Sequence, residues 1–184
     1  MNTIIRHIAS FLIVSILLPL SALAKDRVLS QSTYEALVLT CDSAVNDKSS
    51  VDMFKHAHKT VILANMLESG NANYDNYAPI DSVHYYKSVG LYYMGRYYLE
   101  VGRETSNKHY YQLARNYFRN VINSENIKEH LPDVVNYLAE AYHLNSQTDS
   151  AIYIYQNNID RCKNTNNLRP LSNAYLHLGI IYSE

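Results

Sequence analysis

The sequence predicts an all-α protein in which antiparallel helix pairs stack into a solenoid. Glycine and proline, the two residues least favourable inside helices, occur only 5 and 4 times in 184 residues. The chain is 47% hydrophobic and 18% charged, a composition typical of a packed core rather than of disorder. A similar pattern also recurs three times along the chain, which is the sequence signature of a repeat architecture.

Each recurrence of this pattern has a large apolar residue, a second one three positions later, then Gly or Ala, then Tyr after three more. The three segments are 91–98, 135–142 and 175–182, with the small residue at Gly95, Ala139 and Gly179. Residues three and four positions apart share a helix face, so the small residue lies in the apolar stripe of its helix. We expect it to let the next helix approach closely.

Residues 1–24 have the features of a secretory signal peptide. Arg6 closes a short amino-terminal region, an apolar run covers 8–18, and Ala22-Leu23-Ala24 places small residues where a signal peptidase cleaves. The run is shorter than the roughly 20 residues of a spanning helix, and Pro19 breaks it. We expect cleavage after Ala24 and export to the periplasm or cell envelope. An uncleaved membrane anchor is the alternative.

Residues 25–80 are interpreted as a degenerate capping helix pair and a loop. Helices are expected over 32–45 and 50–69, and the loop over 70–80, which is rich in Asn and contains Gly and Pro. Ala57, Val61 and Ala64 repeat a pattern that is found in the second helices further along. A solenoid needs such a terminal pair to shield the end of its core.

Residues 81–184 are expected to hold the repeats, at about 85–126, 132–163 and an incomplete 170–184. The distance from Gly95 to the small residue of its second helix, Ala114, is longer than in the next unit. We attribute the difference to a longer turn over 103–109. The last unit has only a first helix, which predicts that the chain is part of a longer protein.

These elements resemble the tetratricopeptide repeat over about Tyr85–Tyr182, through L-G-x2-Y and A-x3-F patterns. The resemblance implies a right-handed superhelix of antiparallel helix pairs with a concave ligand-binding surface. The sequence departs from the family pattern in three ways. No Trp opens a unit, Asn158 occupies a position that is usually small, and Pro132 and Pro170 begin the following helices in place of a closing proline.

The resemblance also implies which residues face the concave groove: those three before and one after each small residue. A further candidate lies one turn after the second of these pairs. The candidate partner-binding residues are Tyr92, Arg96, Asn136, Glu140, His143, Leu176 and Ile180. Tyrosine and arginine suit peptide backbones and carboxylates. The alternative interpretation is that these are ordinary solvated helix residues.

No pattern in the sequence predicts catalysis, a metal site or a cofactor. Metalloprotease, serine-hydrolase and phosphate-loop motifs are missing, and the two cysteines are not in a metal-ligand spacing. A net charge of −1 with dispersed Lys and Arg argues against nucleic-acid binding. Cys41 and Cys162 are expected in separate helices as two buried thiols, and a disulfide between them stays open.

The sequence therefore predicts a non-enzymatic, exported scaffold that binds a peptide or protein partner. It is similar to the extracytoplasmic sensory part of bacterial one-component regulators and sensor kinases, in which repeats precede a membrane helix. Membrane contact is then expected only through the signal peptide or a helix further downstream. The alternative is a glycan-binding surface protein, although such proteins are usually lipid-anchored and no cysteine follows Ala24.

Overall fold

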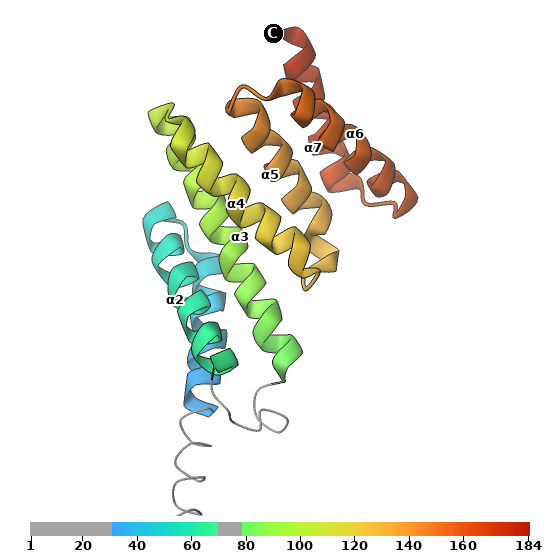
Figure 1. Cartoon of the computed structure of the whole chain (residues 1–184). Coiled ribbons are helices and arrows are strands. Elements are labelled where there is room, and N and C mark those ends of the chain that lie inside the picture. The colour runs from blue at the N-terminus through green and yellow to red at the C-terminus, as the bar shows by residue number, and fades with distance from the viewer. Residues whose placement is uncertain (1–30, 70–78) are drawn as a thin grey trace, which may run out of the picture.

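Figure 1 shows the computed structural model, which describes residues 31–69 and 79–184. Within these two stretches all regular elements are helices, which confirms the all-α prediction. The predicted signal peptide, residues 1–24, lies outside the described residues. Most of the predicted loop over 70–80 lies outside them as well.

The helices follow each other in antiparallel pairs joined by short connections. Residues 31–46 form the first helix that is described, and its partner is α2 (Ser50–Ser69). The following elements are α3 (Ile80–Thr105), α4 (Lys108–Ser124), the short 3-10 helix η2 (Lys128–His130), α5 (Leu131–Leu144), α6 (Thr148–Asn164) and α7 (Leu168–Ser183). The first two helices agree closely with those expected over 32–45 and 50–69, whereas α3 begins at Ile80, before the expected start of the repeats near 85.

Each helix packs mainly against its neighbours in the chain, from α2 through α7. The first helices of adjacent pairs also touch, α3 against α5 and α5 against α7. In Figure 1 the elements accordingly lie side by side in chain order, from blue at one end to red at the other. This arrangement of sequence-adjacent pairs is compatible with an α-solenoid.

Helix α3 approaches its neighbours closely at its glycines. A Cβ atom on Gly95 would lie 2.7 Å from the Phe118 ring of α4, so only glycine allows this contact. Toward α2, a Cβ atom on Gly90 would lie 2.9 Å from the carbonyl oxygen of Ala57. The expected role of Gly95 is thus confirmed, and the sequence interpretation missed Gly90.

The same expectation is wrong for Gly179. It is exposed, and a Cβ atom added there would meet nothing within 4 Å. Helix α7 instead turns Ala174, Leu178 and Ile181 toward the core cluster that it shares with α5 and α6. Among the described residues no helix packs on the face that carries Gly179. Ala139 in α5, by contrast, is fully buried in that cluster.

The predicted long turn over 103–109 is also wrong. Only Ser106 and Asn107 separate α3 from α4. Ser106 has a left-handed backbone with φ of 54°, and the Asn107 side chain accepts a hydrogen bond of 3.0 Å from the backbone N–H of His109. This N-cap starts α4 at once, so the extra length of the unit lies in longer helices.

A network of buried amides joins α5, α6 and α7. Asn158 of α6 donates to the carbonyl oxygen of Pro132 at 2.7 Å and to Oδ1 of Asn136 at 2.8 Å. Asn136 of α5 in turn donates to the carbonyl oxygen of Pro170 in α7 at 2.8 Å. The Asn158 amide thus binds the start of α5 and, through Asn136, is linked to the start of α7, which a small apolar residue at position 158 cannot do.

Cys41 and Cys162 are free and buried, as the sequence predicts. They lie in the helix over 31–46 and in α6, respectively. Burial raises the pKa of the Cys41 thiol from 9.0 to about 12 and also raises the pKa of Cys162. Within residues 31–69 and 79–184, no helix combines the length and apolar character that crossing a bilayer requires.

Candidate ligand-binding groove

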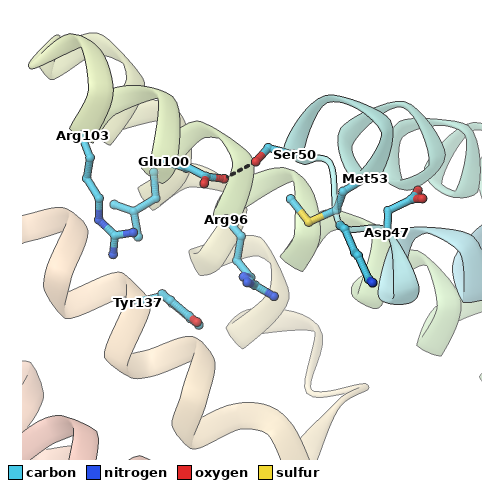
Figure 2. A pocket seen from close by; sticks show the side chains of 9 residues that line it. Asp47, Ser50, Met53, Arg96, Glu100, Arg103 and Tyr137 are labelled. Carbon is cyan, nitrogen blue, oxygen red and sulfur yellow. Dashed lines mark hydrogen bonds between the residues drawn. The ribbon is translucent and has the colours of Figure 1, made fainter.

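Two neighbouring cavities lie along the first helices of the pairs. The first, which we call the polar cavity, has a volume of about 220 Å³ and is shown in Figure 2. Its walls come from the connection before α2, from α2, α3 and α5. The residues that line it are Asp47, Lys48, Ser50, Met53, Arg96, Leu99, Glu100, Arg103 and Tyr137.

The second, which we call the tyrosine cavity, has a volume of about 290 Å³. It extends from the end of the helix over 31–46, across α3 and α5, to the start of α7. The residues that line it are Val45, Tyr85, Val89, Tyr92, Tyr93, Arg96, Ile127, His130, Asp133, Tyr137 and Arg169. Its aromatic and aliphatic walls contrast with the charged lining of the polar cavity.

The two cavities meet at Arg96 and Tyr137, which line both. Figure 2 shows these two side chains pointing toward one another from α3 and α5. Three first helices therefore contribute residues to these adjacent cavities: the helix over 31–46, α3 and α5. We call the two cavities together the groove.

Arg96 is held by aromatic rings. The guanidinium carbon lies 5.8 Å from the ring centroid of Tyr92, 5.3 Å from that of Tyr93 and 5.7 Å from that of Tyr137. These distances allow cation–π attraction, which strengthens as water is removed. Burial is also the largest cause that raises the pKa of the Tyr92 hydroxyl, so this tyrosine stays neutral. The described residues place no carboxylate in an ion pair with Arg96.

Arg103, two turns further along α3, has a different environment. Its Nε donates to the Glu140 carboxylate of α5 at 3.0 Å, and its Nη2 forms a second contact to the same oxygen. The Glu140 side chain is 10% exposed and that of Arg103 is 45% exposed. This ion pair neutralises the buried carboxylate and connects two first helices beside the groove.

The two carboxylates of the polar cavity are also occupied. Ser50 at the start of α2 donates a hydrogen bond of 2.7 Å to Glu100 of α3, shown dashed in Figure 2. Asp47 lies 2.5 Å from Nδ1 of His56. Both acids thus have partners within the protein, and the charge of Glu100 also acts on Arg96, one turn earlier in α3.

Of the residues predicted to face a groove, Tyr92 and Arg96 line the cavities. Asn136 and Glu140 do not, because both are buried at 7% and 8% exposure and are used in contacts within the protein. Asn136 belongs to the amide network, and Glu140 is the partner of Arg103. The structure therefore does not place these two predicted groove residues in the cavities.

The three remaining candidates also lie outside the two cavities. His143 is mostly covered, and its Nε2 is 3.5 Å from a carboxylate oxygen of Glu184. Leu176 and Ile180 of α7 are 62% and 44% exposed, on the face that no described helix covers. The structure therefore does not extend the groove along α7 beyond its first turn, where Arg169 lies.

The sequence interpretation missed Tyr93 and Tyr137 as groove residues, although the sequence contains a signal for them. Both stand two positions before the small residue of their repeat, at Gly95 and Ala139. The third residue in this register is His177, which stacks on Tyr155 with centroids 5.6 Å apart. A recurring aromatic ring at this position therefore marks the inner contact between repeats.

Comparisons with known proteins do not assign the chain to a family. No protein-family model matches the chain, and no curated protein or solved structure is significantly similar to it. Among the described residues, no group of three His, Cys, Asp or Glu side chains is placed to hold a metal ion. The arrangement offers aromatic surface, the guanidinium groups of Arg96 and Arg169 and charges of both signs, which are the features of a binding surface.

Proposed function

We propose that this protein is an exported scaffold of the tetratricopeptide-repeat type that binds a peptide segment of a partner in the groove. The observation that carries the proposal is the groove, two adjacent cavities that receive residues from the helix over 31–46, α3 and α5 and that share Arg96 and Tyr137. In a right-handed superhelix of such pairs, first helices line the concave side. An extended segment can then contact several repeats at once.

The lining favours a peptide over a neutral glycan. Tyrosine rings suit both ligand classes, but the groove also carries Lys48, Arg96 and Arg169 alongside Asp133 and Glu100. A peptide can supply charges of both signs and apolar side chains within a few residues. A neutral sugar chain has no charge with which to match these groups, and their desolvation would oppose its binding.

The proposed location rests on the signal-peptide features of residues 1–24, and the sensory role rests on the resemblance to exported repeat segments of bacterial regulators. Intact-mass analysis of the protein recovered from the periplasm of an expressing bacterium tests the location. Removal of residues 1–24 supports export. A full-length protein confined to the cytoplasm contradicts it.

The binding function is tested by selection from a phage-displayed library of random 12-residue peptides on the full chain. Enriched peptides are synthesised with a fluorescent label, and their dissociation constants are measured by anisotropy. Val45→Trp fills the tyrosine cavity from an exposed position, so it should weaken binding at least tenfold without loss of helicity. Val51→Trp, at an exposed position of α2 outside both cavities, is the matched control.

The outcomes separate the ligand classes. Peptides whose affinity falls with Val45→Trp but not with Val51→Trp support the proposal. A library that yields no binder, or binders that are indifferent to Val45→Trp, contradicts it. Parallel binding to a neutral-glycan array that is lost in Val45→Trp would favour the glycan alternative instead.

A further inference from the structure

A further cavity lies apart from the groove, where the end of α5 meets the start of α6. Its volume is about 430 Å³, larger than that of either groove cavity, and none of its residues lines the groove. It is lined by Tyr142 of α5 and by Asp149, Ser150, Tyr153 and Ile154 of α6. We call it the α6 cavity.

The face of α6 that lines this cavity leaves one tyrosine ring open to solvent. Asp149 and Tyr153 are four positions apart and therefore lie on the same face of the helix. The helix packs into the protein through Ala151 and Tyr155, which are buried. Tyr153 is turned outward and is 68% exposed, and among the described residues no aromatic ring or cation stacks on it. Its ring is available to a ligand.

The Tyr142 wall of the cavity is held in place by Arg115 of α4. The guanidinium carbon lies 4.0 Å from the centroid of the Tyr142 ring, and Nη1 donates to Oε1 of Gln147 in the connection between α5 and α6. The same oxygen accepts a hydrogen bond of 3.3 Å from Nδ2 of Asn145. These contacts order the wall before a ligand binds, which lowers the entropic cost of binding.

The charges at the cavity favour a ligand without net charge. Asp149 places a carboxylate in the lining, while Arg115 places a guanidinium on Tyr142. A charged ligand of either sign is attracted by one of these groups and repelled by the other. A neutral ligand that carries hydroxyl groups can donate to the carboxylate without such repulsion, and the Ser150 hydroxyl can both donate and accept.

A sugar ring has this combination of properties. Its C–H face is apolar and can lie against an aromatic ring, while its hydroxyl groups form hydrogen bonds at the edge. In the groove, the half-buried Arg96 would lose water to a neutral sugar without gaining a charged partner. At the α6 cavity, Asp149 and Ser150 are exposed and keep part of their hydration when a ligand binds, so the desolvation cost is lower.

We infer that the α6 cavity binds a neutral carbohydrate, with one sugar ring stacked on Tyr153 and its hydroxyl groups hydrogen-bonded to Asp149 and Ser150. This site shares no residue with the groove, so the inference goes beyond the proposed function. The chain then has two binding sites, one for a peptide segment of a partner and one for a glycan.

The test screens the full chain on an array of neutral oligosaccharides built from glucose, galactose, mannose and N-acetylglucosamine. Each binder is titrated by isothermal titration calorimetry into wild type, Tyr153→Ala, Tyr153→Phe and the matched control Tyr182→Ala. Tyr182 is 65% exposed on α7 and lies outside the three cavities, so its loss removes the same ring elsewhere. Tyr153→Ala should weaken binding roughly tenfold. Tyr153→Phe should keep most of the affinity, and Tyr182→Ala should leave it unchanged.

A second variant and a second set of sugars test the neutral character of the ligand. Asp149→Asn keeps an oxygen acceptor but removes the charge, so it should weaken binding roughly fivefold, the difference between a charged and a neutral hydrogen bond. Oligosaccharides that contain uronic acids or sulfate groups should bind more weakly than their neutral counterparts. Binding of the anionic sugars alone would overturn the assigned ligand class.

The remaining outcomes decide the location of the site. No binder on the array, or equal affinities for Tyr153→Ala and Tyr182→Ala, overturns the inference. Sugar binding that is lost in Val45→Trp but kept in Tyr153→Ala also overturns it and favours the glycan alternative for the groove. Peptide affinity should not change in Tyr153→Ala, so the two sites are tested separately. Circular dichroism confirms that each variant keeps its helicity.

Discussion

Helices α3 and α7 carry the same repeat pattern, yet their environments differ. The small residue of α3, Gly95, is closed against Phe118, whereas Gly179 of α7 faces open space. Helix α3 packs against α2, α4 and α5, while among the described residues α7 packs mainly against α5 and α6. A repeat pattern therefore predicts which face of a helix can pack against other helices. Which of its positions become buried depends on the helices that are present around it.

The largest expected effect compares a core residue at the α3–α4 contact with an exposed apolar residue of α7. Phe118→Ala removes a fully buried ring and should lower the free energy of unfolding by about 3–5 kcal/mol. Leu176→Ala should change it by less than about 0.5 kcal/mol, because Leu176 is 62% exposed. Urea unfolding followed by circular dichroism measures both. Equal losses would show that the two helices are packed alike.

The two buried thiols extend the comparison to the helix over 31–46 and to α6. With its pKa raised to about 12, Cys41 holds on the order of a thousandfold less thiolate at pH 8 than an ordinary cysteine. Since the thiolate is the reactive form, iodoacetamide should modify native Cys41 slower by at least that factor than the urea-unfolded protein. The native rate should keep rising with pH up to about 12. Mass spectrometry of the peptides should also find Cys162 protected, since its thiol is buried and its pKa raised.

A substitution in the amide network tests how strongly α7 is attached to α5 and α6. Asn158→Ala leaves the Asn136 side chain short of a buried partner and should cost about 1–3 kcal/mol of stability. The adjacent Asn157 is exposed, so Asn157→Ala is a matched control with an effect below about 0.5 kcal/mol. Thermal unfolding of both variants provides the measurement. Similar melting temperatures for the two variants would mean that the network does not stabilise the packing of α7.

The smallest effects should have opposite signs at the two glycines. Gly95→Ala brings a methyl group within 2.7 Å of the Phe118 ring and should lower stability by about 1–2 kcal/mol. Gly179→Ala adds a methyl group in open space inside a helix and should raise stability by up to about 1 kcal/mol. Urea midpoints compare the pair directly. Destabilisation by Gly179→Ala would show that this face is covered in solution.

The helical class and most helix positions were predictable because they follow from local pattern. Apolar spacing and proline placement act within a few residues, so α2, α5 and α6 agree closely with the sequence prediction. The turn over 103–109 was not predicted correctly. A run of polar residues favours a connection between helices. Residues 103–105 are nevertheless helical, because α3 continues beside α4 and α5.

The groove was less predictable, because it depends on contacts between residues far apart in the chain. Tyr92 and Arg96 follow from their register in one helix. Glu140 has the same register as Arg96, yet it is buried because Arg103, which lies 37 positions earlier, reaches it. A single sequence contains no signal for such a pairing. The pairing, however, decides which of two equivalent positions faces solvent.

The pair formed by Arg103 and Glu140 also has a mechanical consequence. It joins α3 and α5, the first helices of two adjacent pairs, beside the polar cavity. Any motion that separates these two helices must lengthen the ion pair, so the pair opposes a relative shift of the two helix pairs.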